Sequence, residues 1–106
     1  MKNRKYTNPK NRILRLFKTN NMIDCSVAIS VCISKGVFDE EVEAYIRKHL
    51  SDERVLMGSY KVKCFSVCAL LLLNKEDLRG TLTDARELDI IERMLASPEI
   101  FDDFAE

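Results

Sequence analysis

Apolar and polar residues repeat with a helical period along most of this chain, most clearly in the segment that follows Asp39. Asp39 is a good N-cap residue, and the acidic side chains in the next turn interact favourably with the helix dipole. Val42, Ile46 and Leu50 then recur at spacings of four residues, which places them on one side of a helix. The pattern predicts an amphipathic helix over about residues 40–50.

Two other segments are apolar around nearly their whole circumference. The first runs from Asp24, a possible N-cap, to Lys35, and Gly36 follows where a left-handed residue often ends a helix. The second covers about residues 60–73. A helix that is apolar all round is usually buried, so we expect these two helices to pair at the centre of the core. Their β-branched residues also permit a buried strand, in the second case over residues 60–67.

Shorter helices are expected near both ends of the chain. Pro9 suits the first turn of a helix, Thr83 precedes another apolar periodic segment, and Ser97 begins a Ser-Pro-Glu sequence typical of a helix start. The buried side of the middle helix should include Leu88, Ile91 and Leu95, with Ile90 and Met94 beside them.

These elements predict an all-α fold, a compact bundle of five or six helices with two apolar central helices. The composition agrees, because 46% of the residues are hydrophobic and 32% are charged, with only three glycines and two prolines. A chain of 106 residues is long enough for one core. We therefore expect a flexible basic arm over residues 1–8 and a single helical domain over residues 9–106.

The cysteines and the single histidine do not form a metal-binding pattern. Cys25, Cys32, Cys64 and Cys68 all lie in apolar runs, and none forms a Cys-x-x-Cys pair. We expect buried free thiols, which behave as small hydrophobic side chains. His49 falls at the end of a predicted helix, where a polar or cationic residue suits the exposed carbonyls. We thus predict no metal site and no cofactor, and reduced thiols without a clear secretory leader favour the cytoplasm.

Charge is the one asymmetric property of the sequence. Seven cations precede the first acid, Asp24, whereas eight acids stand against two arginines from Asp84 onward, which leaves −6 at that end. The two ends can pack together within one molecule, dock between two copies, or leave the arm free to bind phosphates. The candidate binding residues in and next to the arm are Lys2, Arg4, Lys5, Lys10, Arg12 and Arg15.

Part of the sequence resembles winged-helix proteins. Cys32, Gly36, Val37, Val42 and Tyr45 have the spacing of a helix-turn-helix, and residues 55–63 could form the hairpin wing, with Lys61 and Lys63 near phosphates. The resemblance implies a winged-helix-like α+β fold as the alternative. The carboxylates at the start of the would-be recognition helix would repel nucleic acid: Asp39, Glu40, Glu41 and Glu43.

Catalysis has no recognisable basis in the sequence. Gly36, Gly58 and Gly80 stand alone, so no phosphate-binding loop is present, and no histidine lies within a motif that would activate a serine. We expect no enzyme and no catalytic residues.

The sequence favours a non-catalytic protein-protein interaction module that uses helix faces, as an adaptor, regulator or assembly subunit. It would bind a protein partner or a second copy, not a membrane. The alternative is a nucleic-acid-binding regulator with a helix-turn-helix-like core or a basic N-terminal arm.

Overall fold

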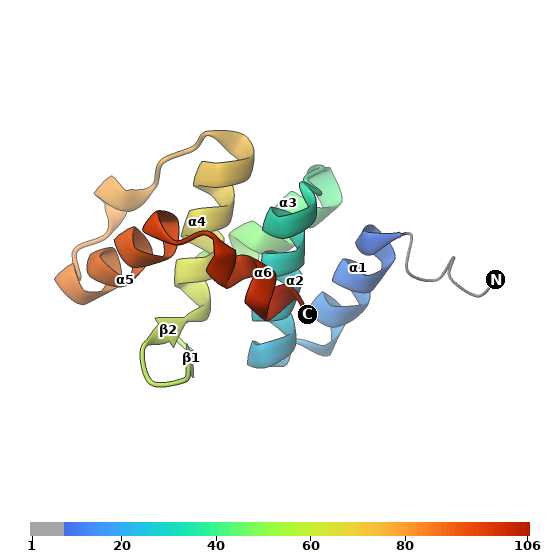
Figure 1. The fold of residues 1–106 in the computed structure, drawn as a ribbon, viewed down its shortest axis with the longest axis horizontal. Coiled ribbons are helices and arrows are strands. Elements are labelled where there is room, and N and C mark those ends of the chain that lie inside the picture. The colour runs from blue at the N-terminus through green and yellow to red at the C-terminus, as the bar shows by residue number, and fades with distance from the viewer. Residues whose placement is uncertain (1–7) are drawn as a thin grey trace.

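The all-α prediction is confirmed by a computed structural model, which describes residues 8–106 and contains six α-helices in that range (Figure 1). A short two-stranded hairpin separates the third helix from the fourth. In chain order the elements are α1 (Pro9–Thr19), α2 (Met22–Lys35), α3 (Glu40–Lys48), the 3-10 helix η2 (His49–Ser51), β1 (Val55–Leu56), β2 (Tyr60–Lys61), α4 (Val62–Asn74), the 3-10 helix η3 (Arg79–Thr81), α5 (Ala85–Ala96) and α6 (Glu99–Ala105).

The predicted central pair is α2 with α4. These two helices contact each other, and α2 also packs against α1 and α6, while α4 packs against η2 and α5. In α4 every residue from Cys64 to Leu70 is buried. The serines in the middle of α2 are buried without loss of hydrogen bonding, because the hydroxyl of Ser26 donates to the carbonyl of Met22 and that of Ser30 to the carbonyl of Ser26. The two helices that are apolar all round, α2 and α4, therefore lie in the core, as the sequence predicted.

The predicted helix ends are correct at some positions and wrong at others. Gly36 ends α2 in the left-handed conformation with φ +69°, and the Asp39 side chain accepts a hydrogen bond from the Val42 N–H at the start of α3. The predicted cap at Asp24 is wrong. Asn21 caps α2 instead, because its side chain accepts from the N–H groups of Ile23 and Asp24, so the helix begins earlier.

The start of α5 and its buried face also differ from expectation. Asp84, not Thr83, is the N-cap, and its side chain accepts from the Arg86 N–H. The buried residues of α5 are Glu87, Ile91 and Met94, whereas Leu88 and Leu95 are only partly buried. The buried face thus includes Ile91, as expected, and is shifted towards Glu87 and Met94. The Glu87 carboxylate lies against Lys61 and Lys63.

The ambiguity over residues 60–67 resolves into a very short strand followed by a helix. Val55 pairs with Lys61 and Leu56 with Tyr60 in an antiparallel hairpin, and α4 begins at Val62. A hairpin thus stands where the winged-helix alternative expected one, but its strands have two residues each. None of the helices in residues 8–106 is long and apolar enough to cross a membrane.

Candidate functional site

The loop of the hairpin exposes a methionine in an unusual backbone conformation. Met57 has φ +46° and Gly58 has φ +85°, so both residues occupy the left-handed region. This conformation suits glycine, but it is disfavoured for a long side chain such as methionine. The Met57 side chain nevertheless lies at the surface, 79% exposed. Neither the backbone nor the packing of the fold requires methionine here.

Beside this loop, α6 completes an apolar groove. Ile100 and Phe104 of α6 lie opposite Met57 and Tyr60 of the hairpin, and together with Asp103 they line a space of about 350 Å³. Its floor is aromatic, since the ring of Phe104 packs edge-on against Tyr60 at 6.2 Å and against Phe65 of α4 at 5.1 Å. We call this space the hairpin groove. An apolar hollow over an aromatic floor can accept an apolar side chain.

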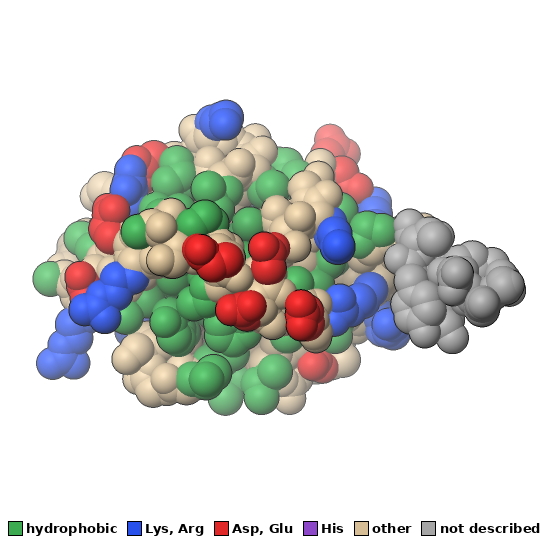
Figure 2. Space-filling model, viewed as in Figure 1, with side chains coloured by type: hydrophobic (Ala, Val, Ile, Leu, Met, Phe, Trp, Pro, Cys, Tyr) green, Lys and Arg blue, Asp and Glu red, His purple; other side chains and the backbone are tan. Residues whose placement is uncertain are grey.

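The surface next to the hairpin groove is strongly acidic. Figure 2 shows a group of acidic side chains on the face where α6 lies, with hydrophobic side chains next to it. The acids of α6 and the C-terminal residue are all exposed: Glu99, Asp102, Asp103 and Glu106. A ligand of the hairpin groove would therefore meet apolar side chains inside and negative charge at the edge.

The predicted basic residues are only partly brought together. Lys2, Arg4 and Lys5 lie outside the described residues. The ammonium of Lys10 lies 2.6 Å from a carboxylate oxygen of Asp39 and 3.2 Å from one of Glu41, and these hydrogen bonds raise the pKa of Lys10. Those two acids, expected to repel nucleic acid, instead pair with a basic residue of α1.

Arg12 connects the two ends of the described chain. Its guanidinium donates a 2.8 Å hydrogen bond to the carbonyl of Ala105 at the end of α6, and the hydroxyl of Ser34 in α2 donates to Asp102. In the described part of the chain, Arg12 of α1 therefore contacts the end of α6 within one molecule. Arg15 is exposed and lies with Arg12 and Lys35 along a second groove between α1 and α2.

Lys61 and Lys63 are both paired with carboxylates and do not form an unpaired basic surface at the hairpin. The Lys61 ammonium lies 2.7 Å from Glu53 and 2.6 Å from Glu87, and that of Lys63 lies 2.8 Å and 3.3 Å from the same two carboxylates. Hydrogen bonds to Glu53 and Glu87 raise the pKa of both lysines. The prediction that these lysines face phosphates is wrong, because both are neutralised within the fold.

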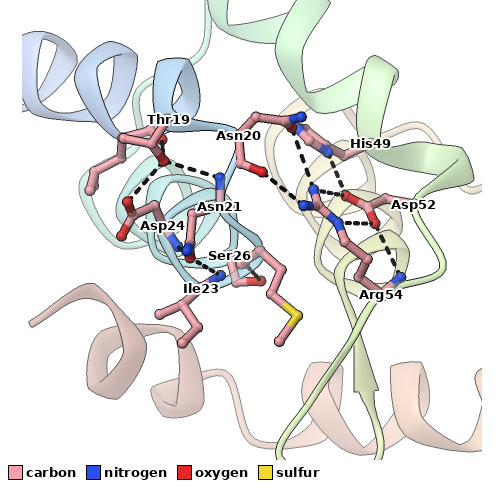
Figure 3. Close-up of polar contacts among 11 residues, drawn as sticks. Thr19, Asn20, Asn21, Ile23, Asp24, Ser26, His49, Asp52 and Arg54 are labelled. Atoms are coloured by element: carbon pink, nitrogen blue, oxygen red, sulfur yellow. Dashed lines mark hydrogen bonds and ion pairs between the residues drawn. The ribbon is translucent and has the colours of Figure 1, made fainter.

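His49 lies at the C-terminal end of α3, as expected, but its side chain is buried. It is 3% exposed, stacks on Phe17 with ring centroids 5.8 Å apart, and its Nδ1 lies 2.8 Å from a carboxylate oxygen of Asp52. Figure 3 shows Arg54 on the other side of Asp52, where it also donates to the carbonyl of Asn20 at 2.8 Å. The pKa of Asp52 is held well below its usual range, chiefly by the Arg54 guanidinium. This network joins the segment after α3 to the turn between α1 and α2.

The four cysteines are buried and free, as expected: Cys25, Cys32, Cys64 and Cys68. Burial raises the pKa of each thiol, to about 12 for Cys32, so none is a ready nucleophile at neutral pH. Over residues 8–106, no three metal-ligating side chains gather in a metal-binding arrangement.

Comparison with known proteins gives one partial likeness. A chain of Arabidopsis thaliana named "Putative F-box protein" is 36% identical over 61 residues, which are 58% of this chain and 21% of that protein. This chain therefore spans about a fifth of the length of that relative. No family model and no solved structure matches the chain.

The hairpin groove was not among the predicted sites. Its residues lie on two segments about 40 positions apart, and no periodicity connects them. The available signal was local. Met57 directly precedes Gly58 in a segment predicted as a possible hairpin, and an apolar methionine is not among the residues that turns favour.

Proposed function

We propose that this chain is a non-catalytic protein-protein interaction module and that the hairpin groove is its contact surface. The partial likeness to an F-box protein supports an interaction role. The all-helical fold supports it as well, since such bundles offer rigid surfaces for docking. An adaptor, a regulator or an assembly subunit in the reducing environment of the cytoplasm agrees with the buried free thiols.

One observation carries the proposal, and it is the exposed Met57 at the edge of the groove. Its left-handed backbone is disfavoured by about 1–2 kcal/mol for a residue other than glycine or asparagine. An exposed apolar side chain of this size adds nothing to the core. Strained residues are often retained at binding sites, where the strain serves recognition, and methionine is common at binding surfaces because it adapts to its ligand.

The residues that line the hairpin groove indicate the chemistry of the expected partner. Tyr60, Ile100 and Phe104 offer an apolar floor for one or two bulky apolar side chains. Asp103 lies at the edge, with the other exposed acids of α6 beyond it. The expected partner is therefore a protein segment with an apolar anchor followed by lysine or arginine, since such a segment matches both the shape and the charge.

Selection from a random peptide library displayed on phage tests this proposal with a defined probe. Peptides selected on the wild-type chain should share a bulky apolar anchor with a neighbouring basic residue. The variant Met57→Asn should lose at least about tenfold in affinity for them, because it removes the most exposed apolar side chain that lines the groove. Asp103→Asn should weaken binding by a smaller factor, and that factor should fall at high salt.

Leu72→Gln is the matched control. Leu72 is an exposed apolar residue near the far end of α4, roughly 15 Å along that helix from its junction with the hairpin. Its replacement should leave peptide affinity unchanged. The proposal is wrong if no peptide family is enriched, or if the selected peptides bind Met57→Asn as tightly as the wild-type chain.

A further inference from the structure

A second groove, unrelated to the hairpin, lies between α1 and α2. It has a volume of about 510 Å³, and its charged lining residues are Arg12, Arg15 and Lys35. No carboxylate is among its lining residues. Pro9 and Val31 add an apolar part to its wall. We call this space the basic groove.

The three cations are held close together without an anion between them. Arg12 and Arg15 are three residues apart on α1 and so lie on one helix face, where like charges destabilise a helix. Within residues 8–106, neither Arg15 nor Lys35 forms an ion pair, whereas Lys10 is neutralised by Asp39 and Glu41. A bound anion would remove the repulsion.

Arg12 is also fixed in position. Its guanidinium donates to the carbonyl of Ala105, so the side chain is held between the basic groove and α6 before any ligand arrives. Guanidinium groups bind carboxylates through paired hydrogen bonds, and a pre-positioned group loses less conformational entropy on binding.

We propose that the basic groove binds an acidic peptide segment of a partner protein. Its positive strip is short, because carboxylates stand next to it. Asp102 and Glu106 line the adjoining cavity that shares Arg12 and Lys35. An extended nucleic-acid backbone that continued into this cavity would place phosphates against these acids, whereas a segment with two or three carboxylates can end before them. This site goes beyond the interaction proposed for the hairpin groove.

Fluorescence anisotropy with a labelled hexaglutamate peptide, at physiological salt and with the full chain, tests the site. The double variant Arg15→Gln with Lys35→Gln should bind the peptide about tenfold more weakly than wild type, because two charge-assisted contacts are lost. Lys18→Gln is the matched control, since Lys18 is an exposed cation of the same helix that does not line the groove. It should change the affinity by less than about twofold.

Three further results separate this proposal from its alternatives. Met57→Asn should bind hexaglutamate like wild type, so failure of the hairpin groove and failure of the basic groove are distinguishable. A single-stranded oligonucleotide of similar charge should bind more weakly than the peptide; tighter binding that depends on Arg15 would make this a nucleic-acid site and overturn the proposal. Loss of peptide binding on replacing Lys2, Arg4 and Lys5, with no loss in the double variant, would place binding on the arm and also overturn it, as would no binding at all.

Discussion

The α2–α4 pair and the hairpin are both rich in apolar side chains, but these side chains are buried in the helix pair and partly exposed at the hairpin. In the helix pair, residues such as Ile29, Phe65 and Leu70 are fully buried. At the hairpin, Met57 is 79% exposed and Val55 is 40% exposed. Burial of the first group explains why the chain folds. Exposure of the second group contributes little to folding, and our proposal assigns these side chains to binding.

The largest expected effect is a loss of stability on substitution in the buried α2–α4 pair. Phe65 is fully buried in α4, and its ring packs edge-on against Phe101 and Phe104 of α6. Phe65→Ala should lower the free energy of unfolding by about 3–5 kcal/mol, because it leaves a cavity between the centre of the core and the last helix. Urea unfolding followed by circular dichroism measures this. A loss below about 1 kcal/mol would show that α6 is not coupled to the core.

A smaller effect is expected from the buried polar network. Asp52→Asn removes the carboxylate that bonds both His49 and Arg54, and should lower the free energy of unfolding at pH 7 by about 2 kcal/mol. The pKa of Asp52 is lower in the folded chain than in the unfolded one, so the charged form stabilises the fold. That contribution is fully present at neutral pH and is lost as the pH falls below about 4. The difference between wild type and variant should therefore shrink in acid, and a constant difference would contradict this cause.

Glu87→Gln tests the contact between α5 and the lysines Lys61 and Lys63. Glu87 is 7% exposed and accepts from Lys61, with Lys63 nearby, so the neutral variant leaves two lysines with weaker partners. We expect a loss of about 1–2 kcal/mol, discounted because both lysines are partly exposed to water. Thermal unfolding at low and high salt measures it. Glu92→Gln, an exposed carboxylate of the same helix, is the control and should cost less.

The smallest stability effect should have the opposite sign. Met57→Asn places a residue that tolerates φ +46° in the hairpin loop and removes little buried surface, so the chain should become more stable by about 0.5–1 kcal/mol. Chemical denaturation measures the gain. A loss of stability would mean that Met57 serves packing, and the contrast between the two regions would disappear.

The sequence predicted most features of the buried helices and few features of the two surface grooves. The periodicity at Val42 and Ile46, the cap at Asp39 and the left-handed Gly36 depend on neighbours along the chain, and all three are confirmed. The burial of Glu87 in α5 is accompanied by an ion pair with Lys61, a residue far away in the sequence. No local pattern could reveal that pairing.

The roles of the predicted binding residues depend on distant contacts for the same reason, and their part in binding stays a prediction. Lys10 and Arg12 are basic in any window of the sequence, but their partners Asp39 and Ala105 come from distant elements. Only the fold shows that Arg15 and Lys35 share a groove. Charge patterning indicated the basic end of the chain as a candidate, while the tertiary contacts decide which cations there have an ion-pair partner in the described part.

The most direct test of the central claim is the methyl NMR spectrum of the four methionines, recorded while a peptide selected on the wild-type chain is added. Met57 lines the hairpin groove, whereas Met94 is buried in α5. The account predicts that the Met57 methyl signal shifts or broadens in proportion to peptide bound, while the Met94 signal stays in place. A Met57 signal that does not change when the peptide is bound would contradict it.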